Sequence, residues 1–305
     1  MTTRQQTMVR PLGRGDLDAV VRIDQEQSGR ARREFFARRL CAPSGEPQSL
    51  VAVAAERGGR LAGFAFAHLL DGEFGGAGPV GVLDAVGVAE AAQRGGVGTA
   101  LLAALEQTLA ERGVRVLRTQ ADWTELGIAA FFSATDFRLA PRVVLERALD
   151  RPIDGDLEAE EIPVRSMTEA DFAEIVRVDG KITGRDRAGY LRRKADEVLR
   201  RSAVRVSLVA ELEGQLAGFL MARVDFGEFG RAEPTAVLDT IGVNPAFAGR
   251  GVGRALVEQL LRNVASLRAE RVVTEVEWGQ LPLLGFLAKA GFGHSQRLAF
   301  DKAIA

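Results

Sequence analysis

Residues 238–256 read Leu-Asp-Thr-Ile-Gly-Val-Asn-Pro-Ala-Phe-Ala-Gly-Arg-Gly-Val-Gly-Arg-Ala-Leu, and residues 83–101 are a second version of the same stretch. The near-continuous apolar run 236–243 is typical of a buried central strand. The glycines that follow allow successive backbone N–H groups to converge on one point, and the start of a helix adds its own N–H groups and the positive end of its dipole. The stretch therefore predicts a phosphate or pyrophosphate seat. Its residues are Gly249, Arg250, Gly251, Val252, Gly253 and Arg254.

An isolated Gly-x-Gly is more often a tight turn or a helix cap, so the turn is tested against two known phosphate loops. A Walker loop requires Gly-Lys-Ser/Thr, which this turn lacks. A dinucleotide fingerprint requires a third glycine three residues after the second. Counted from Gly251 that place holds Leu256, and counted from Gly249 it holds Arg254. Neither loop fits.

The chain repeats itself at an offset of 155 residues. Leu61-Ala-Gly-Phe64 recurs at 216–219, Gly72-Glu-Phe-Gly75 at 227–230, and Trp123 as Trp278. Between the copies, residues 150–161 combine six acidic residues with a proline and a glycine, which is typical of a solvated linker. We therefore expect domains at 1–149 and 162–305 joined by a linker at 150–161, with one large domain of two halves as the alternative.

The composition limits the function classes. The chain has 305 residues, 47% of them hydrophobic, and a formal net charge of −1, so it has no general attraction to nucleic acid or to an anionic membrane. A single cysteine and two histidines argue against an intrachain disulfide and a metal site. The sequence has no apolar run of about 18 residues and no secretory leader, so the expected location is the cytoplasm.

One repeat predicts an α/β unit. Thr168 is the expected N-cap of a first helix, with Asp171 in the capping-box position. Hydrophobic periodicity and turn residues define the other elements of the second half. The expected helices cover 187–199, 253–267 and 281–290, and the expected strands cover 204–211, 216–224, 236–243, 271–276 and 298–304, the last of which closes the sheet.

The strand–turn–helix unit resembles the coenzyme A loop of the GNAT superfamily of N-acetyltransferases. Gln93-x-x-Gly96-x-Gly98 fits the loop pattern fully, whereas Ala248-x-x-Gly251-x-Gly253 lacks the leading Gln/Arg but keeps Asn244-Pro245 before it. The Gly-Phe ending at 291–292 also resembles the family. The resemblance covers both halves. It implies two tandem acyl-CoA N-acyltransferase domains of α/β class, each a mixed, mostly antiparallel sheet with helices on both faces.

The resemblance also implies a chemistry and a set of binding residues. The function would be acetyl transfer from acetyl-CoA, a co-substrate, to a primary amine by direct attack in a ternary complex, without a metal. The central strand would diverge from its neighbour at a bulge, and the N–H of Val243 or Val88 would polarise the thioester carbonyl. The expected acetyl-CoA contacts are Ile241, Gly242, Val243 and residues 249–254 in the second half, and Val88, Gln93, Arg94, Gly96 and Gly98 in the first.

Asp239 is the candidate general base, because it lies four residues before Val243 in a buried strand and burial should raise its pKa. The alternative is a structural Asp that pairs with an arginine. Glu228, in the Gly-Glu-Phe-Gly loop, is the second candidate. The family's usual acid, a tyrosine, is replaced by Leu287 and Phe132, and the single tyrosine is Tyr190. A catalytically weak acyl-CoA sensor or scaffold is therefore the competing function.

The acceptor is expected to be a small-molecule amine or a protein N-terminus, with no nucleic-acid or membrane partner, and an oligomer is possible. The basic stretches 30–39 and 185–194 are either solvated helix faces or part of an acidic acceptor's site. The second half is expected to carry the chemistry, because it offers Arg250 and Arg254 to a pyrophosphate where the first half offers Arg94 alone.

Overall fold

The computed structural model describes residues 6–29, 31–40, 50–71, 79–149, 162–196, 206–226, 234–267 and 269–305. The expected linker 150–161 lies outside these ranges. The first half contains β1 (Met8–Pro11), α1 (Leu17–Ser28), α2 (Arg33–Leu40), β2 (Leu50–Arg57), β3 (Arg60–Asp71), β4 (Pro79–Val88), α3 (Val97–Glu111), β5 (Val116–Asp122), α4 (Leu126–Ala134), β6 (Arg138–Leu139) and β7 (Arg142–Ala148).

The second half repeats this order of elements. It contains β8 (Val164–Ser166), α5 (Phe172–Thr183), α6 (Ala188–Asp196), β9 (Leu208–Leu212), β10 (Gln215–Phe226), β11 (Pro234–Val243), α7 (Val252–Ser266), β12 (Arg271–Glu277), α8 (Leu281–Lys289), β13 (Gly293–His294) and β14 (Arg297–Ala303). The sequence repeat is therefore a repeat of structure, and the predicted fold of two α/β units with mixed sheets is confirmed.

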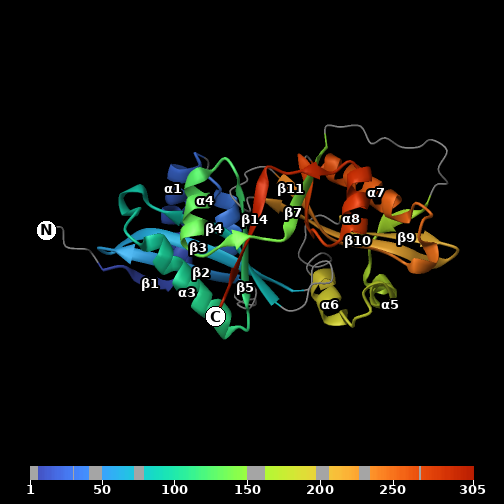
Figure 1. Cartoon of the computed structure of the whole chain (residues 1–305), viewed down its shortest axis with the longest axis horizontal. Helices are drawn as coiled ribbons and strands as arrows, with labels where there is room; N and C mark the ends of the chain where they lie inside the picture. Colours follow the sequence, from blue (N-terminus) through green and yellow to red (C-terminus); the bar gives the residue numbers. More distant parts are fainter. Residues whose placement is uncertain are drawn as a thin grey trace.

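The two sheets exchange their final long strands. Their orders are β1-β2-β3-β4-β5-β14-β6 and β13-β7-β12-β11-β10-β9-β8. Strand β14 lies antiparallel to β5 from Arg297↔Asp122 to Ala303↔Val116, and β7 lies antiparallel to β12. In Figure 1 the red β14 accordingly reaches the first half, and the C-terminus lies beside α3. The expectation that 298–304 closes the sheet of its own half is wrong.

The exchange takes place across a short connection between two strands. Only Ser295 and Gln296 separate β13 from β14, and the backbone continues into the neighbouring sheet instead of folding back. The same side chains are buried in either arrangement, because alternation along a strand is the same in both sheets. Phe300 of β14 packs into the core of the first half, and Leu145 of β7 packs into that of the second.

A buried polar cluster joins the exchanged strands. The guanidinium of Arg142 on β7 donates to both carboxylate oxygens of Asp301 on β14 at 2.7 Å and also pairs with Glu275 on β12. The amide of Gln120 on β5 donates to Glu275 at 2.7 Å. Burial would lower the pKa of Arg142, but Asp301 and Glu275 outweigh it and raise that pKa. The cluster therefore holds a permanent cation where the two sheets meet.

Helices cover both faces of each sheet, as predicted. In the first half, α1 and α2 pack Phe36 against Phe64 and Phe66 on one face, and α3 packs Leu101 and Leu105 on the other. The aromatic rings of the first cluster meet edge-on or tilted at 5.3–5.8 Å. The side chains of β3 alternate between these two cores, so the two faces of one strand are fixed by its sequence.

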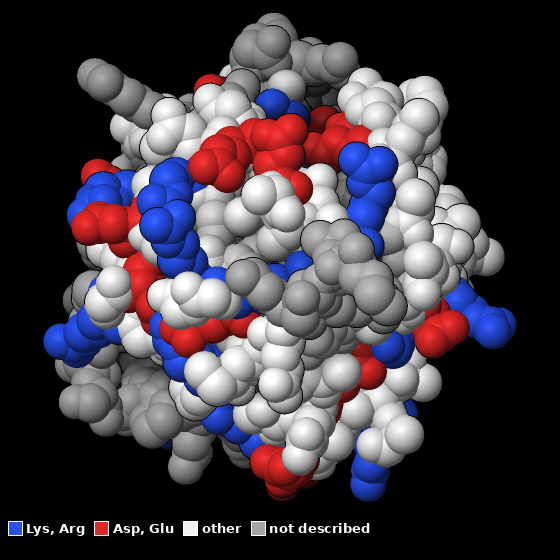
Figure 2. All heavy atoms as spheres, turned by 90° about the vertical axis from the view of Figure 1, so that its left-hand side faces the viewer, with Lys and Arg blue, Asp and Glu red and all other residues white. Residues whose placement is uncertain are grey.

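The surface of the first half mixes the two signs of charge. Figure 2 shows acidic and basic side chains lying beside one another over this end of the molecule. The basic stretch on α2 follows this pattern, because Arg33 pairs with Asp18 at 2.7 Å and Arg38 with Glu34 at 3.6 Å. These contacts favour the interpretation of a solvated helix face.

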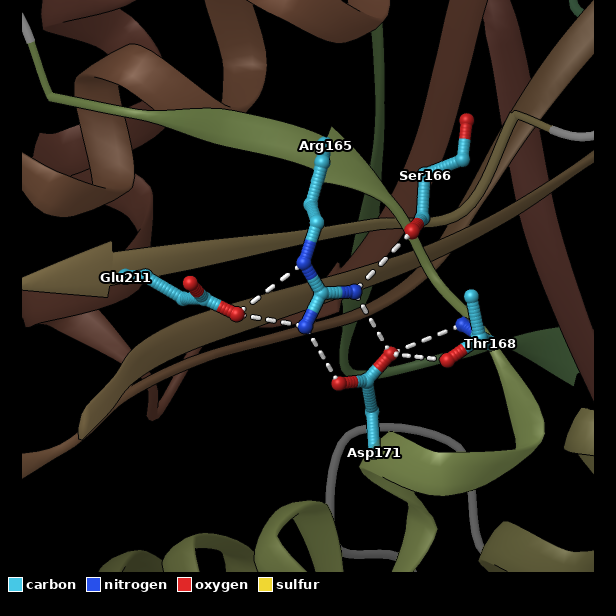
Figure 3. Close-up of polar contacts among 5 residues, drawn as sticks. All are labelled: Arg165, Ser166, Thr168, Asp171 and Glu211. Atoms are coloured by element: carbon cyan, nitrogen blue, oxygen red, sulfur yellow. Dashed lines mark hydrogen bonds and ion pairs between the residues drawn. The ribbon is translucent and has the colours of Figure 1, made fainter. Parts of the chain in front are cut away.

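Each repeat opens with the same polar clamp, drawn for the second half in Figure 3. The Arg165 guanidinium on β8 donates to both oxygens of Asp171 at 2.6 and 2.8 Å and to Glu211 on β9. Asp171 also accepts from the backbone N–H of Thr168, which confirms the predicted capping box. The Arg165 contact outweighs burial and lowers the pKa of Asp171. Arg10, Asp16 and Glu56 form the same clamp in the first half.

Candidate active site

Each sheet opens into a fork between its two parallel central strands. The pairing of β11 with β12 ends at Val237↔Val273, and that of β4 with β5 ends at Val82↔Arg118, although β11 continues to Val243 and β4 to Val88. A threonine closes the base of each fork. Thr274 Oγ1 donates to the carbonyl of Leu238 at 3.0 Å. The opening is the divergence that the sequence resemblance implied.

The backbone at the fork points its donors inward. The N–H of Asn244 donates to Ala217 O at 2.8 Å, on the outer side of β11. Because successive N–H groups of a strand point to opposite edges, the N–H of Val243 faces the β12 side and therefore the fork. Ala89 donates to Ala62 in the same way at 2.9 Å, which directs the N–H of Val88 into the other fork. The two N–H groups expected to polarise the thioester carbonyl thus each face a fork.

The glycine turn caps the helix beside each fork. Gly249 and Gly251 have φ of 77° and 85°, and Gly251 is the N-cap of α7. The first half has Gly96 at φ 83° as the N-cap of α3, and Arg94, at φ 56°, takes the place of Gly249. A left-handed arginine is strained by about 1–2 kcal/mol. Such strain is most often retained at functional sites.

Packing accounts for the other glycines of the turn. A Cβ on Gly253 would lie 3.2 Å from the Phe286 ring of α8, and one on Gly98 would lie 2.8 Å from Phe131 of α4. A Cβ on Gly242 would lie 2.6 Å from Phe219. These three glycines are needed for packing whether or not a ligand binds, so their presence alone does not identify a binding site.

Four further expected contacts lie beside the forks. Val252 is buried and begins α7, and Ile241 is half-buried near the end of β11. Gln93 Nε2 donates to the carbonyl of Val88 at 3.2 Å, which ties the first turn to its strand. Arg254 pairs with Glu258 at 2.7 Å.

Arg250, on which the preference for the second half also depended, pairs with Glu213 at 2.7 Å. Both side chains of the Arg250 pair are exposed, and such pairs contribute about 0–1 kcal/mol. Arg250 can therefore exchange this partner at small cost. However, the two cations counted as an advantage of the second half each already have a carboxylate neighbour.

Asp239 lies at a bulge and is held by two cations. The register of β10 against β11 passes from Met221↔Thr240 to Ala222↔Leu238, so Asp239 is the extra residue. It is buried, with Oδ2 3.3 Å from Lys194 Nζ of α6 and Oδ1 paired with Arg223 of β10.

The expected rise in the pKa of Asp239 is wrong. Burial acts to raise that pKa, but Arg223 and Lys194 together outweigh it and lower the pKa. The sequence showed that the strand would be buried, but it did not show which side chains from α6 and β10 would meet the carboxylate. Glu228, the second candidate, lies outside the described residues.

The first half has a different cluster at the equivalent bulge, and the sequence analysis missed it. Asp84 is the extra residue of β4, between Phe66↔Ala85 and Ala67↔Leu83. Its Oδ1 lies 2.7 Å from His68 Nδ1 on β3, and its Oδ2 lies 3.1 Å from Arg39 Nη2 on α2. The 155-residue offset aligns His68 with Arg223 and Arg39 with Lys194. Comparing the two copies at that offset would have revealed the cluster.

The positions of the family's tyrosine hold buried apolar side chains. Leu287 and Phe132 both belong to the cores of their halves. Tyr190 lies on α6 in a separate cluster with Met167 and Ile175, and the Arg187 guanidinium lies 4.5 Å from its ring centroid. The family's tyrosine position therefore cannot supply an acid in either half.

Two features are absent from the described part of the chain. No group of three or more His, Cys, Asp or Glu side chains in it is arranged to hold a metal ion. None of its helices is both long and apolar enough to cross a membrane.

Comparison with known proteins identifies the family. The sequence matches the Acetyltransferase (GNAT) family over residues 17–131 and again over residues 171–292. The chain therefore belongs to this family of acyltransferases and contains two tandem copies of its domain.

Solved structures agree with this assignment at the level of the fold. A GCN5-related N-acetyltransferase from Sphaerobacter thermophilus is similar over 100% of this chain and 97% of its own, with a TM-score of 0.65 and 18% identity. A tandem GNAT protein from the clavulanic acid biosynthesis pathway is similar over 98% and 99%, with a TM-score of 0.65 and 17% identity. A glucosamine N-acetyltransferase region of a fungal multi-domain GH3 β-N-acetylglucosaminidase gives 0.71 at 16% identity, but this chain spans only 38% of that protein.

Proposed function

We propose that this protein transfers an acetyl group from acetyl-CoA to a primary amine by direct attack in a ternary complex. The observation that carries the proposal is the combination of a fork, an inward-facing N–H at Val88 or Val243, and a helix N-cap glycine beside it. The acceptor would be a small-molecule amine or a protein N-terminus, and the reaction would take place in the cytoplasm.

Different backbone groups of the chain would contact different parts of acetyl-CoA. Acetyl-CoA supplies an activated acetyl thioester. The N–H groups of residues 96–98 and 251–253, at the positive ends of α3 and α7, would hold the pyrophosphate. Val88 or Val243 would donate to the thioester carbonyl as negative charge develops on its oxygen. The strand edges that are exposed where the strands diverge would bind the pantetheine, as the edge of a sheet binds an added strand.

The base must remove a proton from the acceptor's ammonium group. Asp239 remains a candidate, but to act it must accept a proton while both its oxygens contact cations. Opposite charges favour the ionised form of a carboxylate, so this arrangement weakens Asp239 as a base. Glu228 remains a second candidate.

One observation favours a different function. The buried Leu287 and Phe132 replace the family's acid, and a chain with weak proton transfer could serve as an acyl-CoA sensor or scaffold. Both functions require acetyl-CoA binding, so binding alone does not separate them.

Turnover separates them. The full chain is mixed with acetyl-CoA and a panel of amines, polyamines, amino sugars and N-terminal peptides, and the released thiol and acetylated product are measured. Steady, amine-dependent thiol release with an equal amount of N-acetyl product supports the transferase. Tight calorimetric binding of acetyl-CoA without release above the uncatalysed rate would instead support the sensor.

A further inference from the structure

The two bulge clusters differ in one chemical respect. In each cluster, a buried aspartate contacts a cation from the second helix of its half. The same aspartate also contacts a side chain from the strand that precedes its own strand. In the second half that strand supplies Arg223, which stays protonated in proteins. In the first half it supplies His68, whose imidazole is neutral in one protonation state and can then accept a proton. The first cluster therefore contains an imidazole at the place where the second contains a guanidinium.

We propose that His68, held by Asp84, is the general base of the reaction, and that acetyl transfer takes place in the first half. The inference rests on the proposed function. It reverses the preference for the second half, because Arg250 and Arg254 have carboxylate neighbours and Asp239 is held by two cations.

The contact with Asp84 selects the state of the imidazole that a base needs. Asp84 Oδ1, 2.7 Å from Nδ1, accepts the proton on that nitrogen. The neutral ring then carries its lone pair on Nε2, and Asp84 stabilises the imidazolium that forms when Nε2 takes a proton. Arg39 contacts the other oxygen of Asp84 at 3.1 Å, which fixes the carboxylate. The cross-strand neighbours of His68, Leu50 and Val82, are apolar.

The cluster lies on the face of β4 that α1 and α2 cover. Arg39, near the end of α2, contacts Asp84 of β4. Gln27, near the end of α1, donates its amide N–H to the carbonyl of Val88, four residues further along β4, at 2.6 Å. Four residues along a strand span about 13 Å. His68 would therefore have to act on an amine placed near Val88 through intervening water molecules rather than by direct contact.

The reaction transfers one acetyl group and releases two protons from the acceptor nitrogen. His68 Nε2 takes one proton from the acceptor's ammonium group, and the neutral amine attacks the acetyl carbonyl. A C–N bond forms and the C–S bond breaks, so the electron pair leaves on the coenzyme A sulfur. The second proton lost by the nitrogen neutralises that thiolate, and His68 returns the first proton to solvent.

The test uses the full chain and its two histidines. His68→Asn keeps an N–H close to the Nδ1 position for Asp84 but removes the base. It should lower kcat by about 10²-fold or more, with calorimetric acetyl-CoA affinity and the melting temperature little changed. It should also abolish the acid limb of the pH–rate profile. His294→Asn, at the exposed end of the second half, is the matched control and should retain wild-type kcat.

Asp239→Asn provides the competing arm. His68→Asn should lower kcat more than Asp239→Asn does. If His68→Asn stays within threefold of wild type, the inference is overturned, and loss of turnover in an Asp239→Asn chain that keeps a folded melting transition would assign the base to Asp239. If the wild-type chain releases no thiol with any amine, the proposed transferase function itself has failed.

A second readout needs no turnover. NMR of the ligand-free chain resolves the rings of the two histidines, and the variants assign them. The His68 signal should shift between pH 5 and 8, and Asp84→Asn should move its midpoint to lower pH, because the carboxylate favours the charged ring. A His68 signal that does not respond to Asp84→Asn would refute the coupling on which the inference depends.

Discussion

Phe300 offers a test of the strand exchange, because it belongs to β14 of the second half yet packs in the core of the first half. It is 7% exposed, and its ring centroid lies 5.5 Å from that of Phe132 on α4. Truncating a buried Phe to Ala costs about 3–5 kcal/mol. For a unit of about 150 residues this corresponds to a loss of roughly 6–20 °C in melting temperature.

The assay is hydrogen exchange followed by peptide mass spectrometry. In Phe300→Ala, protection should fall first in α3, β5 and α4, although these elements lie more than 160 residues earlier in the sequence. Leu145→Ala, the equivalent truncation in β7, should reduce protection in α7 and β12 instead. If Phe300→Ala loosened α7 and β12 and left α3 and β5 unchanged, each half would close its own sheet and the exchange would be refuted.

Three further predictions concern stability. Asp239→Asn should cost about 3–5 kcal/mol in urea unfolding, because it removes the buried carboxylate charge that contacts Lys194 and Arg223. The pKa of Asp171 is lowered by Arg165, so its contribution to stability is present above the unfolded pKa of about 3.9 and is lost as the pH falls through the folded value. Asp171→Asn should therefore flatten the decline in melting temperature between pH 5 and 2. Gly98→Ala should lose about 1–3 kcal/mol, whereas Gly253→Ala should lose less, because its added Cβ meets the facing ring at 3.2 Å rather than 2.8 Å.

Local features of the sequence predicted local features of the fold well. The glycine turn, the capping box at Thr168 and the amphipathic helix expected at 253–267 each depend on residues close together in the chain. The structure contains all three, with the helix at Val252–Ser266. The repeat predicted two similar units for the same reason. Residues 298–304 could have paired in the sheet of either half, because the two sheets offer equivalent partner strands. The sequence pattern does not show which of the two sheets this strand joins.

In the candidate site, too, the features that depend on nearby residues were predicted and those that depend on distant residues were not. The sequence placed Asp239 in a buried strand and Val243 at its end, and both positions are confirmed. The sign of the pKa shift depended on Lys194 and Arg223, which lie 45 and 16 residues away and meet the carboxylate only in three dimensions. The sequence did not predict His68 as a site residue, because a single histidine in a strand carries no functional signal by itself. Its alignment with Arg223 across the repeat reveals that the two bulge clusters differ.

The most direct test of the account is thiol release by two matched pairs of helix-cap variants, Gly96→Asp with Gly96→Asn, and Gly251→Asp with Gly251→Asn. Asp and Asn both tolerate left-handed backbone, and added Cβ atoms at these positions meet no close contact, so each pair differs mainly in charge. A carboxylate about 6 Å from the pyrophosphate should cost about 1–3 kcal/mol of binding, or roughly 5–150-fold. The account predicts that, at limiting acetyl-CoA, turnover falls by this factor from Gly96→Asn to Gly96→Asp and falls less across the Gly251 pair. A loss confined to the Gly251 pair would place the chemistry in the second half and contradict the account.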